Sequence, residues 1–127
     1  MSRMFLGASA FNQPINTNGN KWNTSNVTNM TSMFYSAKAF NQPLSNWDTS
    51  RVTDMNSMFD STAFNQDISD WDTSNVKEMM YMFQNTSVFN QPLNTDGNKW
   101  NVSNVTRMNL MFYNANSFNQ DINLSLI

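Results

Sequence analysis

One tripeptide, Phe-Asn-Gln, occurs five times along the chain and constrains its fold more than any other feature. The copies begin at Phe11, Phe40, Phe64, Phe89 and Phe118, so successive copies lie 29, 24, 25 and 29 residues apart. A period of about 20 to 50 residues is typical of proteins built from stacked units, in which each unit buries its apolar face against its neighbours. We therefore expect one domain over residues 1–127, made of units that repeat along a single axis.

After each of the first four tripeptides, three further columns of apolar residues recur at a fixed spacing from one another. Each Trp is followed five residues later by Val and three residues after that by Met, and a Met-Phe pair begins three residues further on. The columns are Trp22, Trp47, Trp71 and Trp100; Val27, Val52, Val76 and Val105; and Met30, Met55, Met79 and Met108. Together with the Phe of each tripeptide, these residues form the predicted core.

The spacing predicts one short helix and one short strand in each unit. In Val-x-x-Met-x-x-Met-Phe the apolar residues stand at i, i+3, i+6 and i+7, which is one face of a helix of two to three turns. The preceding Asp-Thr-Ser supplies an N-cap at Thr49 or Ser50. The Ile or Leu after the tripeptide is expected in a short strand that begins at the column holding all three prolines. The predicted fold is an α/β solenoid of about five units.

The tripeptide also divides the chain into units. The bounds are a partial unit 1–10, full units 11–39, 40–63, 64–88 and 89–117, and a partial terminal unit 118–127. Met1 to Phe5 align with Met30 to Phe34, and no polar terminal cap is visible at the start. Because stacked repeats normally need polar caps, the sequence favours a fragment of a longer array or a unit that stacks end to end.

Composition excludes several classes of chemistry. The chain has no His and no Cys, which removes thiolate nucleophiles, imidazole bases, the usual zinc sites and disulfides. Seven scattered basic residues and a formal net charge of −2 predict no nucleic-acid partner and no direct insertion of this segment into a membrane. Asp67, Asp70 and Asp72 cluster in one unit only, so we expect a solvated surface rather than a calcium site or a glycosidase pair. We expect no enzyme, no catalytic residue, no cofactor and no metal.

Three repeated columns admit a binding role beside a structural one. The Trp column is expected to be a buried stack whose indole N–H needs a partner, rather than an exposed platform for sugars. The Met column is expected to fill the core rather than to line a ligand groove. The Asn and Gln of each tripeptide are expected to form internal amide ladders that satisfy the backbone, rather than to bind ligand amides or hydroxyls.

The repeat resembles that of bacterial surface proteins and mycoplasma-type lipoproteins, a domain family of unknown function. The residues that carry the resemblance are Val-x-x-Met-x-x-Met-Phe followed by Phe-Asn-Gln-(Pro/Asp)-(Ile/Leu)-Ser-(Asn/Asp)-Trp-Asp-Thr-Ser. Such repeats are similar to BspA-like leucine-rich repeats, in which Val52, Met55, Met58 and Phe59 would take the Val-x-x-Ile and Ala-Phe positions. The resemblance implies a right-handed, leucine-rich-repeat-like coil, located on a cell surface or outside the cell, and it brings no catalytic residues.

The predicted function is a non-enzymatic, surface-displayed repeat protein for adhesion, which binds a protein or a glycan on another surface. Contacts are expected from the loops that differ between units and from two inserts with Asn-Gly or Asp-Gly turns before Trp22 and Trp100. Tyr is favoured because it is a frequent interface anchor. The candidate binding residues are Tyr35, Tyr81, Tyr113, Lys21, Lys99, Asn18 and Asp96. The alternative is a structural unit that associates end to end into filaments.

Overall fold

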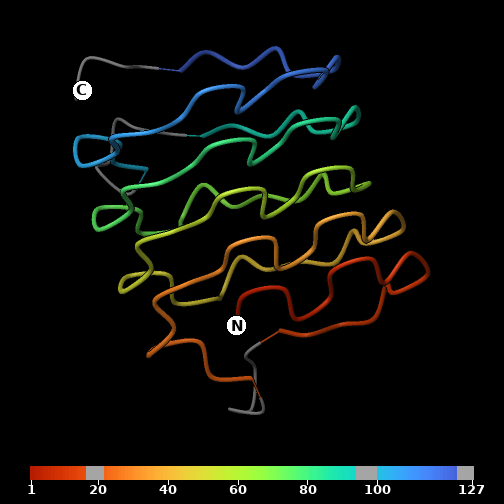
Figure 1. The fold of residues 1–127 in the computed structure, drawn as a ribbon, viewed down its shortest axis with the longest axis horizontal. Coiled ribbons are helices and arrows are strands. Elements are labelled where there is room, and N and C mark those ends of the chain that lie inside the picture. The colour runs from red at the N-terminus through yellow and green to blue at the C-terminus, as the bar shows by residue number, and fades with distance from the viewer. Residues whose placement is uncertain (17–21, 94–99, 123–127) are drawn as a thin grey trace.

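The repeat units lie on one another as successive coils of one chain (Figure 1). The computed structural model describes residues 1–16, 22–93 and 100–122. In each coil, one side comprises residues 29–37 or their equivalents and is called the turn side, and the other comprises residues 40–47 or their equivalents and is called the amide side. Backbone hydrogen bonds join the equivalent segments of neighbouring coils, such as the bond from the Met30 N–H to the carbonyl of Asp54, the residue before its equivalent Met55, at 2.9 Å.

The expected α/β solenoid, with one short strand and one short helix in each leucine-rich-repeat-like unit, is wrong. The described residues contain no helix and no extended strand. The β pairing among them consists of three isolated parallel bridges, which join Asn29 to Asp54, Asp54 to Glu78 and Glu78 to Arg107. Each coil is instead a series of tight turns connected by irregular segments.

Two residues with positive φ in each coil break the segment that was expected to be helical. In the middle of the stack these are Ser57, with φ 56°, and Ser61, with φ 62°. A residue in this left-handed region cannot continue a right-handed helix. Turn bonds such as Met58 N–H to the Met55 carbonyl alternate with bonds to the next coil, such as Phe59 N–H to the Met82 carbonyl at 2.9 Å. Bonds between coils therefore replace the i to i−4 bonds of a helix.

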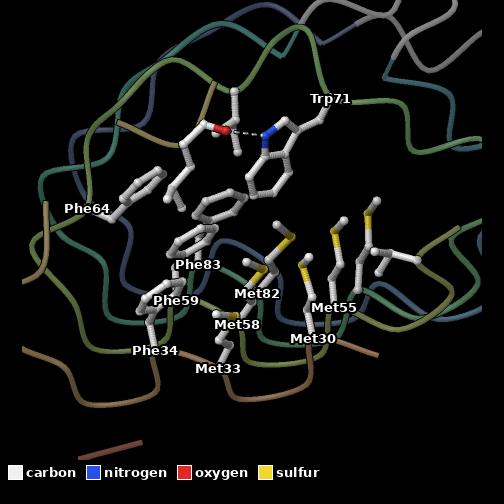
Figure 2. Close-up of a cluster of buried hydrophobic side chains, with 14 of the residues drawn as sticks. Met30, Met33, Phe34, Met55, Met58, Phe59, Phe64, Trp71, Met82 and Phe83 are labelled. Atoms are coloured by element: carbon white, nitrogen blue, oxygen red, sulfur yellow. Dashed lines mark hydrogen bonds between the residues drawn. The ribbon is translucent and has the colours of Figure 1, made fainter. Parts of the chain in front are cut away.

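The apolar columns nevertheless point into the interior, between the two sides of each coil (Figure 2). The ring of Phe59 stacks on the rings of Phe34 and Phe83, with centroids 5.6 Å and 5.7 Å apart. Within its own coil it packs on Phe64, with centroids 4.0 Å apart. All four rings are fully buried, and burying one such side chain stabilises the fold by about 1.5–3 kcal/mol.

The residues predicted for the core are buried in the inner coils and partly exposed near the two ends. The buried ones are Trp47, Trp71, Trp100, Phe40, Phe64, Phe89, Val52, Val76, Met30, Met55 and Met79. The partly buried ones are Trp22, Phe11, Phe118, Val27, Val105 and Met108. The first and last coils that the structure describes have a neighbouring coil on one side only, so their side chains are more exposed to solvent.

The asparagines of the tripeptide form the expected amide ladder. The Asn65 side-chain oxygen accepts a hydrogen bond from the Asn90 N–H at 3.0 Å, and the Asn65 N–H donates to the Asn41 side-chain oxygen at 2.8 Å. The Gln91 side chain also donates to Asn65, at 3.2 Å to its carbonyl and 3.1 Å to its side-chain oxygen. The ladder thus satisfies backbone N–H groups at every coil boundary on the amide side among the described residues, but it lies at the surface and not in the interior, since Asn12, Asn90 and Asn119 are exposed.

The tryptophan column follows its structural prediction at Trp47, Trp71 and Trp100, which are buried, whereas Trp22 is half-buried. The Trp71 indole N–H donates to the Leu44 carbonyl of the preceding coil at 2.9 Å (Figure 2). Trp47 and Trp100 make the same bond, each at 2.9 Å. A Trp ring that is buried in this way cannot serve as an exposed platform for sugars.

The Asp-Thr-Ser segment closes a turn and does not cap a helix, which corrects the expected N-cap at Thr49 or Ser50. The Asp48 carboxylate accepts bonds from the Ser50 hydroxyl at 2.6 Å and the Ser50 N–H at 2.9 Å, which is an Asx turn. These bonds hold the pKa of the Asp48 carboxyl below its usual range. The buried Thr49 hydroxyl donates to the Asp72 carbonyl of the next coil at 3.0 Å.

Candidate binding surface

One column of residues on the turn side varies from coil to coil while its backbone geometry is repeated. It follows the Phe of each Met-Phe pair and is called the Tyr35 column; its members are Leu6, Tyr35, Asp60, Gln84 and Tyr113. The carbonyl groups of the last four accept an N–H bond from the preceding coil at 2.7 to 2.9 Å. Different side chains are therefore carried on the same hydrogen-bonded framework.

The exposure of the Tyr35 column differs strongly along the stack. Tyr113 is 54% exposed, Tyr35 is 38% exposed and Leu6 is also exposed. Gln84 is half-buried, whereas Asp60 is only 3% exposed. A Tyr side chain combines a flat apolar ring with a hydroxyl group, which suits contact with a peptide or a sugar. The exposed side chains of the column thus lie toward the two ends of the described stack, and its buried side chain lies between them.

Asp60 places a carboxyl group in the interior of this column. Its carboxylate accepts a hydrogen bond from the Ser61 hydroxyl at 2.7 Å and one from the Gln84 side chain at 3.4 Å. Burial raises the pKa of the Asp60 carboxyl, and bonds from the Ser61 and Asn85 side chains oppose this only in part. Desolvation outweighs these bonds because it penalises the charged form of the group.

The raised pKa predicts that Asp60→Asn increases the free energy of unfolding at neutral pH. The folded state holds the Asp60 proton more tightly than the unfolded state does, so the carboxyl's contribution to stability is present below its usual pKa of 3.8 and is lost as the pH rises through the folded value. The uncharged amide does not titrate. Urea unfolding at several values between about pH 3 and pH 8 should show the gain of the variant appear as the pH rises. An equal or lower stability of Asp60→Asn at neutral pH would contradict this.

Charged residues on the turn side lie mainly along the column of parallel bridges. Arg107 and Glu78 approach to 3.7 Å between guanidinium nitrogen and carboxylate oxygen, and Arg107 is largely exposed, so this pair contributes about 0–1 kcal/mol. Just before the turn side, the Arg51 guanidinium donates to the Asn26 side-chain oxygen at 2.7 Å. In this part of the surface, acidic and basic side chains thus lie among amide side chains and form no patch of one charge.

No group of acidic residues among those described is placed to hold a metal ion. In the same ranges, no helix has the length and apolar character needed to cross a membrane.

The comparisons with known proteins give one match. A family model described as "Mycoplasma protein of unknown function, DUF285" matches residues 1–124. The chain belongs to this family. This confirms the mycoplasma-family part of the resemblance, whereas no match supports the part that concerns BspA-like leucine-rich repeats. No curated protein and no solved structure matches the chain.

The three tyrosines predicted for binding do not form one group in this DUF285 protein. Tyr35 and Tyr113 share the Tyr35 column but are three coils apart. Tyr81 lies in a different column, is half-buried and has φ 60°. The other candidates, Lys21, Lys99, Asn18 and Asp96, lie outside the described residues.

The sequence prediction placed Asp60 and Gln84 in the loops that differ between units without selecting them for binding, and it left out Leu6. Leu6, Asp60 and Gln84 occupy the position directly after Phe in their units. Aligning that position across units was enough to place them beside Tyr35. The prediction instead selected residues by type, and a leucine, an aspartate and a glutamine carry no interface signal of their own.

Proposed function

We propose that this DUF285 chain is a non-enzymatic binding module, displayed on a cell surface, that contacts a protein or a glycan on another surface through the Tyr35 column. The observation that supports the proposal is the combination of varied, exposed side chains with a repeated backbone. Tyr35 and Tyr113 are exposed, while their carbonyl groups hold the same position between coils. Repeat proteins use such extended surfaces for recognition.

The framework behind this surface is ordered before any partner arrives. The carbonyls of the column are fixed by bonds to the preceding coil, and the neighbouring Phe34, Phe59 and Phe83 rings are stacked and fully buried. A partner therefore has to order only the exposed side chains, which keeps the entropic cost of association low.

The cell-surface location in this proposal rests on the resemblance to repeats of bacterial surface proteins. A relation to BspA-like repeats would add support for the cell-surface location. That relation would be one of sequence pattern only, because the described residues lack the helix and strand of those units. The weakly charged surface fits recognition by amide and hydroxyl groups and by aromatic contact, since the chain has only 13% charged residues.

Binding to a defined panel of probes tests the proposal. Purified mucin, fibronectin, collagen and an array of immobilised glycans are presented to the wild-type chain and to Tyr35→Ala and Tyr113→Ala. We expect at least one probe to bind the wild type, and we expect each Tyr variant to weaken that binding about tenfold or more, as loss of an aromatic anchor does.

Ser45→Ala is the matched control. Ser45 is exposed on the amide side, away from the Tyr35 column, so its replacement should leave binding unchanged. The proposal fails if the panel binds the folded chain no better than a heat-unfolded sample, or if the Tyr variants and Ser45→Ala bind equally well.

A further inference from the structure

One coil in the middle of the stack is a residue shorter than the others at the corner that follows the Met-Phe pair. Four residues, 60–63, separate Phe59 from Phe64, whereas five separate the equivalent phenylalanines of every other unit. Both rings nevertheless keep their columns. Phe59 stacks on Phe34 and Phe83, and Phe64 stacks on the equivalent rings of both neighbouring coils, with centroids 6.0 and 6.2 Å away. Residues 60–63 therefore follow a shorter path between the same two columns.

A series of backbone hydrogen bonds joins these corners where both coils have five residues. The N–H of the fifth residue donates to the carbonyl of the fourth residue in the preceding coil. Ala39 donates in this way to Ser9 at 3.2 Å, and Ser117 donates to Ser87 at 3.1 Å. In this series the carbonyl points toward the following coil and the N–H points toward the preceding coil.

The short coil breaks this series on both of its sides. Among the described residues, the N–H groups of Ala63 and Val88 donate to no protein atom, and the carbonyl of Lys38 accepts from none. By their equivalence with the bonded groups, the Lys38 carbonyl and the Val88 N–H both point toward the corner of the short coil. We call the surface formed by Lys38, Ala39, Ala63, Ser87 and Val88 the short corner.

The short corner combines exposed apolar groups with one positive charge. Val88 is 45% exposed, and Ala39 and Lys38 are also exposed. Asp60 is the other charged residue in the segments 35–39, 60–63 and 84–88, and its side chain is buried. The Lys38 ammonium group is therefore the charge that a partner meets at this surface.

We propose that the short corner binds an extended peptide segment of a partner protein, with an aliphatic side chain against Val88 and an acidic side chain beside Lys38. The peptide backbone supplies an N–H to the Lys38 carbonyl and a carbonyl to the Val88 N–H, as an added strand does at the edge of a sheet. Paired segments lie roughly 4.8 Å apart, and two such spacings separate the coils on either side of the short one. A segment that follows the path of the missing residue can therefore pair with both coils.

A peptide matches these groups better than a glycan does. Each peptide unit carries one donor and one acceptor at a fixed spacing, and the short corner offers one of each from its two flanking coils. An aliphatic side chain buries apolar surface against Val88 and Ala39, whereas a sugar hydroxyl placed there loses water without gaining a hydrogen bond. A carboxylate forms a charge-assisted hydrogen bond with the Lys38 ammonium group. This inference concerns another surface than the Tyr35 column and does not depend on binding there.

Completing the short corner from within the chain is the main test. Insertion of one Ser between Thr62 and Ala63 gives the short coil the five residues of its neighbours. The inserted residue takes the place of the partner's backbone, so we expect peptide binding to fall at least about tenfold while the free energy of unfolding does not decrease. The matched control is insertion of one Ser between Ser69 and Asp70 on the amide side, where two other units are four residues longer. The control should leave binding unchanged.

The probe is an array of capped hexapeptides, Thr-Ser-X-Z-Ser-Thr, in which X and Z take every pair drawn from Val, Leu, Ser, Asp, Glu and Lys. We expect the wild type to bind most tightly the peptides that pair an aliphatic residue with an acidic one. Peptides with Lys in place of the acidic residue should bind least tightly. N-methylation removes a backbone donor, and at one of the two central residues it should weaken the best peptide about tenfold.

A change of charge at Lys38 tests the same contact without an insertion. Lys38→Glu should reverse the preference, so that peptides with Lys bind more tightly than peptides with Asp or Glu. Lys77→Glu is the matched control, because Lys77 is also exposed but lies at the other end of the turn side, next to Glu78. It should keep the preference of the wild type. Fluorescence of the buried tryptophans shows whether each variant is folded.

Three results would overturn the inference. The first is an array in which no peptide binds the wild type more tightly than it binds the chain with Ser inserted after Thr62. The second is a Lys38→Glu chain that keeps the preference of the wild type, and this result decides the matter if the insertion variant does not fold. The third is binding of immobilised glycans, and not of peptides, that is lost on insertion after Thr62, because the short corner would then be a glycan site.

Discussion

Phe59→Ala is expected to lower the free energy of unfolding by about 3–5 kcal/mol. Phe59 is fully buried, and its ring packs on Phe34, Phe64 and Phe83 with centroids 5.6, 4.0 and 5.7 Å away. It also packs on Trp71, with centroids 6.1 Å apart. Removing the ring leaves a cavity that the stacked coils above and below cannot close without losing their bonds. Because a domain is stable by only about 5–15 kcal/mol, this loss is a large part of the total.

Urea unfolding followed by tryptophan fluorescence measures this loss, at concentrations at which the chain is monomeric. Phe112→Ala is the matched control, since Phe112 belongs to the same column but is half-exposed and contacts only Phe83 and Phe118 among the described rings. We expect the control to cost less than half as much. Equal losses of unfolding free energy in Phe59→Ala and Phe112→Ala would contradict the prediction, because they would mean that the burial of Phe59 adds no stability beyond that of the half-exposed Phe112. Phe59→Leu, a milder change, keeps the comparison possible if Phe59→Ala does not fold.

The second large effect is expected from Trp71→Phe, which should lower the free energy of unfolding by about 2–4 kcal/mol. The change keeps an aromatic ring but removes the indole N–H that donates to the Leu44 carbonyl at 2.9 Å. Trp71 and Leu44 are both fully buried, so the carbonyl keeps only its bond from the Trp47 N–H at 3.0 Å and cannot replace the lost bond with one to water. The smaller ring adds the cost of a cavity.

Trp22→Phe is the control for this prediction. Trp22 occupies the same column in the first full unit, is partly exposed, and its indole N–H has no hydrogen-bond partner among the described residues. We expect it to cost less than about 1 kcal/mol. Thermal unfolding of both variants gives the comparison, and a loss at Trp22 as large as that at Trp71 would contradict a role for the buried hydrogen bond.

The core was predictable from the sequence because burial depends on which positions recur, and recurrence is visible without a structure. Residues such as Phe64, Trp71 and Met55 occupy columns that hold the same residue type in every full unit, and all three are fully buried. The amide ladder was predictable for the same reason, since Asn65 and Gln91 recur where neighbouring coils meet.

The backbone conformation was not predictable from that spacing. Apolar residues at i, i+3, i+6 and i+7 lie on one face of a helix, but they also face inward in a series of turns that are bonded to the next coil. The positive φ of Ser57 and Ser61 decides between the two, and serine gives no local signal for that conformation, as glycine would. Only in the first unit does a glycine, Gly7 with φ 72°, occupy one of these columns.

The candidate surface was predictable in part. Tyr35 and Tyr113 were selected for their residue type and are exposed in the structure. Their shared column, and the buried carboxyl of Asp60 between them, follow from the stacking of coils that lie more than twenty residues apart in sequence.

For this protein, the sequence by itself determined the repeat, the positions that face inward and the polar groups that join one unit to the next. The tertiary structure alone decided that the units are coils of turns rather than helix and strand, and that the bonds between turn sides include a repeated series from N–H groups of one coil to carbonyls of the following coil. The physical reason is that about half of the backbone hydrogen bonds among the described residues join one coil to its neighbours, so the conformation of a coil depends on groups about 25 residues away as well as on local propensity.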